Sequence, residues 1–400
     1  MSLLEKFAPL NKMRTDLLEY GSLPFGVVTE RIISPTIGIV HGRETILAGS
    51  NNYLGLTFEP SCIEAAKAAL DAEGTGTTGS RMANGTYSTH HALEQELAAF
   101  FDRQHALVFT TGFLATMGMV STLAGRDDVL LIDADSHASI YDGCRLGGAE
   151  IIRFRHNDPA DLEKRLRRLG ERSANTLVVA EGLYSMLGDQ PPLEAIVDIK
   201  DRYGACLLLD EAHSMGVFGA HGRGLAEALD LEDRVEFVVG TFSKSLGSVG
   251  GFCVSNLPEL DLIRMAARSY IFTASPAPSV VASTREALKL IATRPELRER
   301  LWRNANQLYS GLQESGFQVG PQPSPVVAVF VDQAELAIEW WHQLLDNGIY
   351  VNLVIPPATP STSCLLRCSM SAAHTTEQVN KIVSSFADLR SENRVAGSAV

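Results

Sequence analysis

Lys244 lies in a loop of small residues. The segment GTFSKSLGSVGGF, residues 240–252, follows the apolar run VEFVV and places Lys244 between two serines, with glycines on both sides. A lysine amine can bind a carbonyl compound as a Schiff base when its surroundings activate it. A lysine in a surface turn is the alternative, and other residues must decide between the two.

Asp210 ends another apolar run, ACLLL, one chain crossover before the run that precedes Lys244. Parallel strands have their carboxyl ends at the same edge of a sheet, so the side chains of Asp210 and Lys244 can converge. This pair fits a pyridoxal phosphate site, in which the lysine binds the cofactor's aldehyde and the carboxylate keeps the pyridine nitrogen protonated. A plain ion pair is the alternative.

Neighbouring residues favour the cofactor site. The segment TTGF, residues 110–113, ends a predicted strand just before a predicted helix, where free backbone N–H groups can bind a phosphate. Thr241 and Ser243 add hydroxyl groups beside the lysine. His137 and His213 both follow strand ends, where one could stack on the ring and one could donate to its phenolate oxygen. Either histidine could instead be structural.

These residues are placed by a repeating pattern of strands and helices. Apolar strands are predicted at 105–112, 128–137, 149–158, 176–186, 205–214 and 235–244, with helices at 61–74, 159–171 and 193–204 among them. Continuous apolar strands separated by helices indicate an α/β fold with a mostly parallel, doubly covered sheet. Each strand ends in polar residues, among them Thr110, Thr111, Asp135, His137, Glu181, Asp210 and Thr241. In such sheets the ligand lies at the carboxyl ends of the strands, so we expect a ligand site there.

The chain is expected to divide into three parts. Residues 1–50 are predicted to form an N-terminal helix and arm, residues 51–282 a large cofactor-binding domain, and residues 283–400 a smaller C-terminal α+β domain, because the pattern becomes rich in helices after about residue 283. A chain of 400 residues is too long for one small core.

Composition excludes several classes of partner. Acidic residues outnumber basic ones by 47 to 34, and the formal charge of −13 disfavours binding to nucleic acid or to anionic membranes. No run approaches the 18 apolar residues of a membrane span, and Glu5 and Lys6 interrupt any apolar signal core. The six cysteines include no CxxC, so we expect free thiols in a cytoplasmic protein.

Three further motifs do not carry a function. The segment GTGTTG, residues 74–79, follows a predicted helix instead of a strand, which argues against dinucleotide binding. The segment DEAH, residues 210–213, resembles a helicase box, but the chain has no phosphate loop of the form GxxxxGK[ST]. His90 and His91 have no ligand-spaced partner, so they are expected to be exposed, and no metal is predicted.

Several motifs together resemble one family. The segments GTFSKSLGSVGGF, LLLDEAHSMGVFG, IDADSHASIYDG and EGLYSMLGD resemble those of the α-oxoamine synthases, which have the type I aminotransferase fold. The resemblance extends from SNNYLGL to CLLRCS and so covers most of the chain. Within the family, TFSKS, SMLGD, SRMANGT and PPATP are most similar to the soluble bacterial branch that uses serine and a palmitoyl thioester.

The resemblance implies a decarboxylating Claisen condensation of an amino acid, here L-serine, with a long-chain acyl thioester such as palmitoyl-CoA. The product would be a 3-oxo amine such as 3-ketodihydrosphingosine, made in the first step of sphingolipid synthesis. It also implies a homodimer with shared active sites. Alternatives are a family member that uses alanine or glycine, or one that takes its acyl group from an acyl carrier protein.

The resemblance also assigns roles to single residues. Lys244, Asp210 and His137 are the implied catalytic residues. The implied cofactor-binding residues are Gly112, Phe113, His137, Ser185, Asp210, His213, Thr241, Ser243, Lys244 and, reaching the partner subunit's phosphate, Thr273 and Ala274. Asn51 and Arg367 are the implied ligands of the substrate carboxylate.

Two positions depart from the pattern of the serine-using branch. That branch is expected to have an arginine just before PPATP, and this chain has Ile355. A guanidinium binds a carboxylate through two hydrogen bonds and isoleucine makes none, so the identity of the amino acid is the open question. Phe113 in place of tyrosine is a milder change, since either ring can pack over the cofactor.

Overall fold

The computed structural model describes residues 3–21, 23–356, 358–359 and 362–397, and the chain folds into two compact units. The first comprises the described residues of Met1–Ser50, Met186–Gly188 and Trp302–Val400, and the second comprises Asn51–Ser185 and Asp189–Leu301. The three-part division at residues 50 and 282 stays a prediction.

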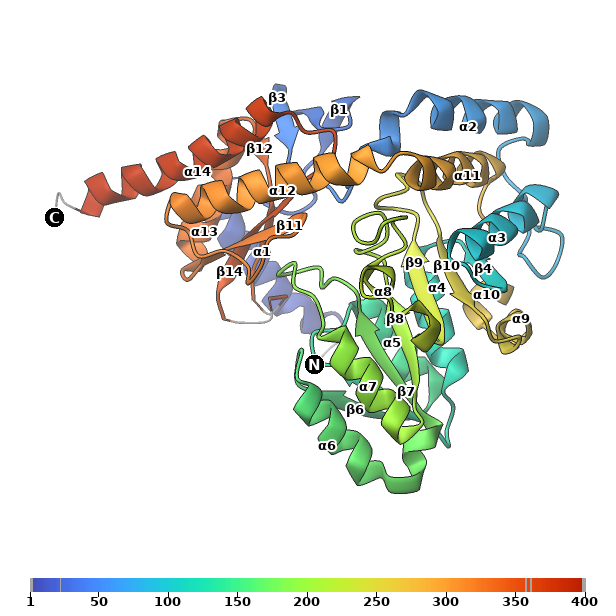
Figure 1. The fold of residues 1–400 in the computed structure, drawn as a ribbon. Helices are drawn as coiled ribbons and strands as arrows, with labels where there is room; N and C mark the ends of the chain where they lie inside the picture. The colour runs from blue at the N-terminus through green and yellow to red at the C-terminus, as the bar shows by residue number, and fades with distance from the viewer. Residues whose placement is uncertain (1–2, 22, 357, 360–361, 398–400) are drawn as a thin grey trace. The chain divides into compact units, whose positions relative to one another are not determined.

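A seven-stranded sheet forms the centre of the second unit (Figure 1). Its strand order is β4-β10-β9-β8-β7-β5-β6. The five strands from β9 to β6 are parallel, whereas β10 runs antiparallel to both of its neighbours. The strands are β4 (His105–Phe109), β5 (Val129–Asp133), β6 (Glu150–Phe154), β7 (Thr176–Glu181), β8 (Cys206–Asp210), β9 (Phe237–Thr241) and β10 (Gly251–Ser255).

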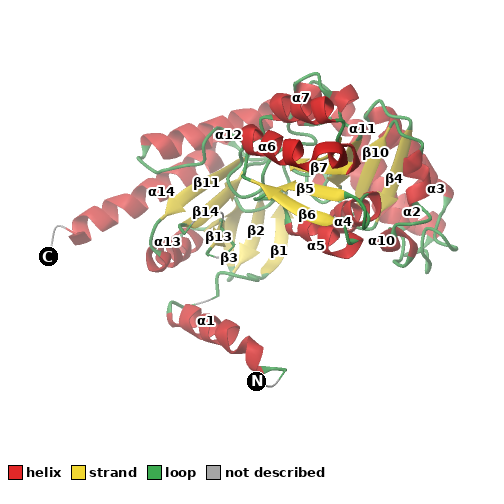
Figure 2. Ribbon diagram, turned by 90° about the horizontal axis from the view of Figure 1, so that it is seen from below, coloured by secondary structure: helices red, strands yellow, loops and turns green. Residues whose placement is uncertain are grey.

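Helices cover both faces of this sheet, as its apolar strands require. Figure 2 shows α6 and α7 on one face and α4 and α5 on the other. Side chains of α4 and α5, among them Met119, Ile140 and Cys144, join the buried core with the sheet residues Leu130 and Val239. The helices of this unit are α2 (Pro60–Glu73), α3 (Ser88–Phe100), α4 (Gly112–Leu123), α5 (Ala138–Gly147), α6 (Pro159–Leu169), α7 (Leu193–Tyr203), α8 (Leu225–Ala228), α9 (Glu259–Ile263), α10 (Arg268–Ile271) and α11 (Pro278–Thr293).

The first unit contains two smaller sheets. One has the order β1-β2-β3-β12 and the other the order β11-β14-β13. The strands are β1 (Thr29–Ser34), β2 (Ile37–Val40), β3 (Arg43–Leu47), β11 (Val326–Val331), β12 (Ile349–Tyr350), β13 (Asn352–Val354) and β14 (Cys364–Ser369). The helices are α1 (Ala8–Glu19), α13 (Ala334–Asp346) and α14 (Thr376–Gly397), while α12 (Glu296–Glu314) crosses the boundary between the units.

The structure confirms the mostly parallel sheet and corrects two details. Strand β10 was not expected, because its five residues directly follow a glycine-rich loop; all five are nevertheless buried between β4 and β9. His90 is not exposed: its ring is fully buried, with Nδ1 accepting from the Tyr87 N–H (3.1 Å) and Nε2 lying 2.8 Å from the Pro276 carbonyl oxygen. This histidine caps α3, a role that side-chain spacing alone does not reveal.

All six cysteines are free thiols. The described residues contain no group of three or more His, Cys, Asp or Glu side chains arranged to hold a metal ion. No helix in the described part of the chain has both the length and the apolar character needed to cross a membrane.

Candidate active site

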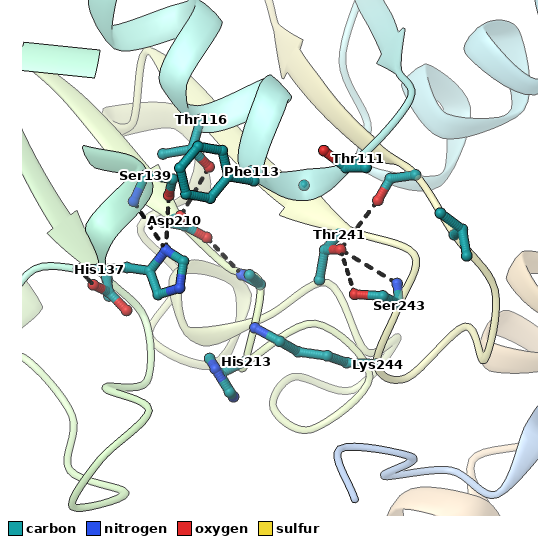
Figure 3. A pocket seen from close by; sticks show the side chains of 15 residues that line it. Thr111, Phe113, Thr116, His137, Ser139, Asp210, His213, Thr241, Ser243 and Lys244 are labelled. Carbon is teal, nitrogen blue, oxygen red and sulfur yellow. Dashed lines mark hydrogen bonds between the residues drawn. The ribbon is translucent and has the colours of Figure 1, made fainter. Parts of the chain in front are cut away.

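A cavity of about 290 Å³ lies at the carboxyl edge of the seven-stranded sheet (Figure 3). It is bordered by residues that end or follow β4, β5, β7, β8 and β9, as ligand sites in open parallel sheets are. The lining residues are Thr111, Gly112, Phe113, Thr116, His137, Ser139, Glu181, Asp210, Ala212, His213, Thr241, Ser243, Lys244, Val249 and Gly250.

Asp210 closes β8 and is almost fully buried, with 5% of its surface exposed. Its Oδ2 accepts a hydrogen bond from the Thr116 hydroxyl (3.1 Å), and its Oδ1 accepts one from the Ala212 N–H (2.9 Å). One donor on each oxygen fixes the carboxylate plane. Asp210 therefore presents a buried, oriented carboxylate to the cavity.

Lys244 follows β9, the strand adjacent and parallel to β8. The turn that carries it is held by the Gly247 N–H, which donates to the Lys244 carbonyl oxygen (3.0 Å), and by the Phe242 N–H, which donates to the Gly250 carbonyl oxygen (2.9 Å). Gly247 and Gly250 have φ values of +60° and +140°, which glycine adopts most readily. Figure 3 shows the lysine side chain pointing into the cavity, toward the side occupied by Asp210 and His137.

The amino end of α4 meets β9 at the cavity. Thr111 caps the helix by accepting the Leu114 N–H (3.1 Å), and Gly112 is its first residue. A Cβ added to Gly112 would lie only 2.6 Å from the Thr241 side chain, so only glycine permits this approach. The Thr241 hydroxyl is in turn 2.9 Å from that of Ser243. Helix N–H groups and two hydroxyls thus form a cradle suited to a phosphate.

His137 is the N-cap of α5. Its Nδ1 accepts the Ser139 N–H (3.2 Å), so the neutral imidazole carries its proton on Nε2. Desolvation by the surrounding protein and the charge of Lys244 lower the pKa of His137, while Asp210 opposes this shift. The ring meets Phe113 edge-on at 6.3 Å, and the residue is exposed and lines the cavity, where a second ring can stack on it.

Two buried residues that position the histidines were not predicted. Tyr53 is fully buried, and its hydroxyl is 2.7 Å from Nδ1 of His213. Glu181 ends β7 opposite Asp210 and accepts the backbone N–H of His137 (2.5 Å). Burial and the charge of Asp210 raise the pKa of Glu181 well above its ordinary value. Glu181 is one of the polar residues that end the predicted strands, and Tyr53 lies in the segment SNNYLGL, but the sequence assigned neither a role.

Eight of the expected cofactor residues line the cavity: Gly112, Phe113, His137, Asp210, His213, Thr241, Ser243 and Lys244. Thr111, Thr116, Ser139, Glu181, Ala212, Val249 and Gly250 line it as well without having been assigned a role.

Five expected residues do not line this cavity. Ser185 is half-buried in the loop after β7, and Thr273 and Ala274 follow α10, where the Thr110 hydroxyl donates to the Ala274 carbonyl oxygen (2.6 Å). Asn51 begins the second unit. Arg367 is buried in β14 of the first unit and donates to the Ser369 hydroxyl (3.0 Å). The roles of these five residues stay predictions.

The lining fits pyridoxal phosphate group by group. Asp210 suits the pyridine nitrogen, the imidazole of His137 suits the cofactor's ring, the cradle at Gly112 and Thr241 suits the phosphate, and Lys244 suits the aldehyde.

Comparison with known proteins agrees with this geometry. Residues 43–386 match the family model of aminotransferase class I and II. The chain is 54% identical to serine palmitoyltransferase of Caulobacter vibrioides over 97% of this chain and 96% of that protein. It is 51% identical to serine palmitoyltransferase of Sphingomonas paucimobilis over 96% and 92%, and 40% identical to 8-amino-7-oxononanoate synthase of Geobacter sulfurreducens over 88% and 91%.

A solved structure of SPT with PLP has a TM-score of 0.96 to this chain at 49% identity, covering 99% of this chain and 100% of that one. The chain belongs to the aminotransferase class I and II family. Within that family it is an α-oxoamine synthase whose similarity to serine palmitoyltransferases extends over nearly its whole length, so the expected type I aminotransferase fold and pyridoxal phosphate cofactor are confirmed.

Proposed function

We propose that the protein condenses L-serine with a palmitoyl thioester, with loss of carbon dioxide, to give 3-ketodihydrosphingosine. The observation that carries the proposal is the cavity in which Asp210, His137 and Lys244 converge, in a chain 54% identical to a serine palmitoyltransferase over nearly its full length. The same cofactor and residues serve other α-oxoamine synthases, so the reaction class follows from the site and the substrates follow from the similarity.

Each residue of the cavity has a task in this reaction. Bound pyridoxal phosphate supplies an electron sink for bonds broken at the amino acid's Cα. Asp210 holds the proton on the pyridine nitrogen, and the ring of His137 stacks on the cofactor. Lys244 is the cofactor's attachment point and the base that removes the Cα proton. His213 and Ser185 are assigned to the phenolate oxygen.

Three further proposals concern the oligomeric state, the acyl donor and the cellular compartment. We assign Thr273 and Ala274 to the phosphate site of a partner subunit, which makes the enzyme a homodimer. Palmitoyl-CoA is the proposed acyl donor, with an acyl carrier protein thioester as the alternative. We place the reaction in the cytoplasm.

Ile355 favours a second candidate for the amino acid. Arg367 and Asn51 are the assigned ligands of the substrate carboxylate, and the arginine that the serine-using branch is expected to have at position 355 is replaced. A pocket without that arginine could prefer alanine, which gives an enzyme of the same class with a different substrate.

The test is a panel of amino acids. Serine, alanine and glycine are each added to the holoenzyme, the change in cofactor absorbance gives a Kd for each, and product from palmitoyl-CoA is identified by mass. We expect serine to bind and to give 3-ketodihydrosphingosine. An absorbance change with alanine and none with serine would remove the serine assignment and leave the reaction class.

The variant Ile355→Arg tests whether position 355 contributes to recognition of the substrate carboxylate. A charge-assisted hydrogen bond contributes roughly 1.5–3 kcal/mol, so the variant should bind serine about ten- to a hundredfold more tightly. Ile355→Leu is the matched control and should leave the Kd unchanged. Unchanged serine affinity in Ile355→Arg, with the fold intact, would show that position 355 does not contribute to carboxylate recognition.

A further inference from the structure

His156 is a charged group at the same edge of the sheet but outside the lining of the cavity. It lies two residues after β6, where its Nδ1 is 2.8 Å from Asp133 Oδ1 and its Nε2 is 2.7 Å from Asp189 Oδ2. Asp133 is fully buried and Asp189 is 7% exposed. A ring nitrogen bonded to a carboxylate oxygen must donate, so both nitrogens carry a proton and His156 is an imidazolium.

Asp133 and Asp189, the two carboxyl groups bonded to His156, also accept hydrogen bonds from other residues. Oδ1 and Oδ2 of Asp133 accept the backbone N–H groups of Asp135 (2.8 Å) and Asn157 (3.0 Å). Oδ2 of Asp189 also accepts the Asn157 side-chain amide (2.8 Å). Asp133 and Asp189 thus each bond both the His156 ring and at least one further N–H donor, and the ring is held between the two carboxyl groups.

The cluster of His156, Asp133 and Asp189 joins three loops. Asp133 ends β5 and begins the loop that carries His137, and His156 belongs to the loop after β6. The Asp189 carbonyl oxygen accepts the Tyr184 N–H (2.9 Å), and the Tyr184 ring meets the His156 ring edge-on at 4.5 Å. Tyr184 lies in the loop that follows β7.

We propose that His156 is a positioning residue for the cofactor site: by bonding Asp133 and Asp189 at once, it fixes the loops after β5 and β7 and so holds His137 in place. The proposal deepens the proposed function and rests on it for the role of His137. Without the imidazolium, two buried carboxylates would face each other with Asp135 nearby, whose Oδ2 is 3.8 Å from His156 Nδ1. Removing one partner of a buried ion pair strongly destabilises the folded state.

The cluster also gives the fold a pH dependence of known sign. Burial lowers the pKa of His156, but the hydrogen bonds and charges of Asp133 and Asp189 outweigh it and raise the pKa from 6.5 to about 10. The titratable groups that face the ring are these two, Asp135 and Tyr184. A raised pKa in the folded state means that the stabilisation is complete below pH 6.5 and is lost as the pH rises toward 10.

The main experiment compares His156→Gln with Lys200→Gln. Glutamine is uncharged, and its two N–H donors share one nitrogen, so it cannot replace the bonds that Nδ1 and Nε2 make to different carboxylates. Lys200 is the control because, like the half-buried His156, it is paired with two carboxylates. Its partners Asp201 (2.8 Å) and Glu236 (2.5 Å) precede strands β8 and β9 instead of following strands.

Two readouts separate positioning from stability. Hydrogen exchange of the cofactor-free protein should be at least tenfold faster in residues 133–140 and 182–189 of His156→Gln, and unchanged there in Lys200→Gln. The Kd for pyridoxal phosphate should rise about tenfold or more in His156→Gln alone, with a weaker visible circular dichroism of the bound cofactor. Equal exchange and equal Kd in the two variants, or faster exchange spread over the whole chain, would overturn the proposal.

Two further measurements cover other outcomes. Asp189→Asn removes one charge and keeps the shape, so it should partly restore the Kd when added to His156→Gln; no recovery would contradict the charge argument. If His156→Gln does not fold, Asp189→Asn alone must show the faster exchange.

The pH dependence of stability gives another test. The difference in unfolding free energy between wild type and His156→Gln should shrink from pH 6.5 to 10, and a difference that stays constant would contradict the proposal. Failure of wild type to bind pyridoxal phosphate would instead refute the proposed function.

Discussion

At the scale of single residues, the site depends on an amine and a carboxylate that adjacent parallel strands bring together. Asp210 is held by Thr116 and Ala212, while Lys244 is placed by a turn that two glycines permit. In the proposed reaction the two residues therefore differ in what their loss should do: removal of Lys244 would take away a reacting group, and neutralisation of Asp210 would change the electronics of the cofactor.

Lys244→Ala should abolish turnover and the absorbance band of the covalently attached cofactor. The lysine is half-buried in a turn, so the melting temperature and far-UV circular dichroism should stay close to those of wild type. Absorbance spectroscopy and a product assay test this. A variant that still condenses serine with palmitoyl-CoA would show that another residue is the base.

Asp210→Asn should keep the fold, because the asparagine can still accept a hydrogen bond from Thr116 or Ala212. An amide does not hold the pyridine nitrogen protonated, so exchange of the serine Cα proton should slow on the order of 100-fold or more. Proton NMR in deuterated water measures this exchange. Exchange at the wild-type rate would remove Asp210 from its assigned role.

At the scale of elements, the sequence predicts the strands better than it predicts contacts between residues that lie far apart in the chain. The strands of the parallel sheet are apolar throughout and end in polar residues, so both the sheet and the edge that carries Asp210 and Thr241 could be predicted. The place of strand β10 beside β4 and the burial of His90 could not, because each is defined by contacts with distant residues such as Val108 and Pro276. The same holds for Tyr53, whose partner His213 is 160 residues away.

The amino end of α4 provides a prediction about an element. Gly112→Ala places a Cβ 2.6 Å from the Thr241 side chain, which must shift at a cost of about 1–3 kcal/mol. The cofactor's phosphate then loses its cradle, and the Kd for pyridoxal phosphate should rise about tenfold or more. Gly76→Ala is the control, since its Cβ would meet nothing within 4 Å. If both variants bind pyridoxal phosphate with the same Kd, the cofactor's phosphate binds elsewhere.

At the scale of the whole molecule, the question is whether one chain is sufficient for catalysis. Thr273 and Ala274 do not line the cavity of their own chain, yet the segment that follows α10 is firmly held. Ser275 is buried, and its hydroxyl donates to the Gly85 carbonyl oxygen (2.6 Å). Phe272, by contrast, is 73% exposed. A fixed turn beside an exposed aromatic ring is what a shared site would need from a partner.

A mixing experiment tests the shared site. Lys244→Ala removes the amine from a subunit's own cavity, and Thr273→Asp should repel the phosphate bound by the partner, so each variant alone should be inactive. In a mixed dimer, the Lys244→Ala subunit supplies the intact Thr273 to the cavity that still has Lys244. That dimer should regain about half of the wild-type activity, because one of its two sites is complete. No activity on mixing, with mixed dimers demonstrated by ultracentrifugation and mass spectrometry, would mean that Thr273 acts in its own subunit.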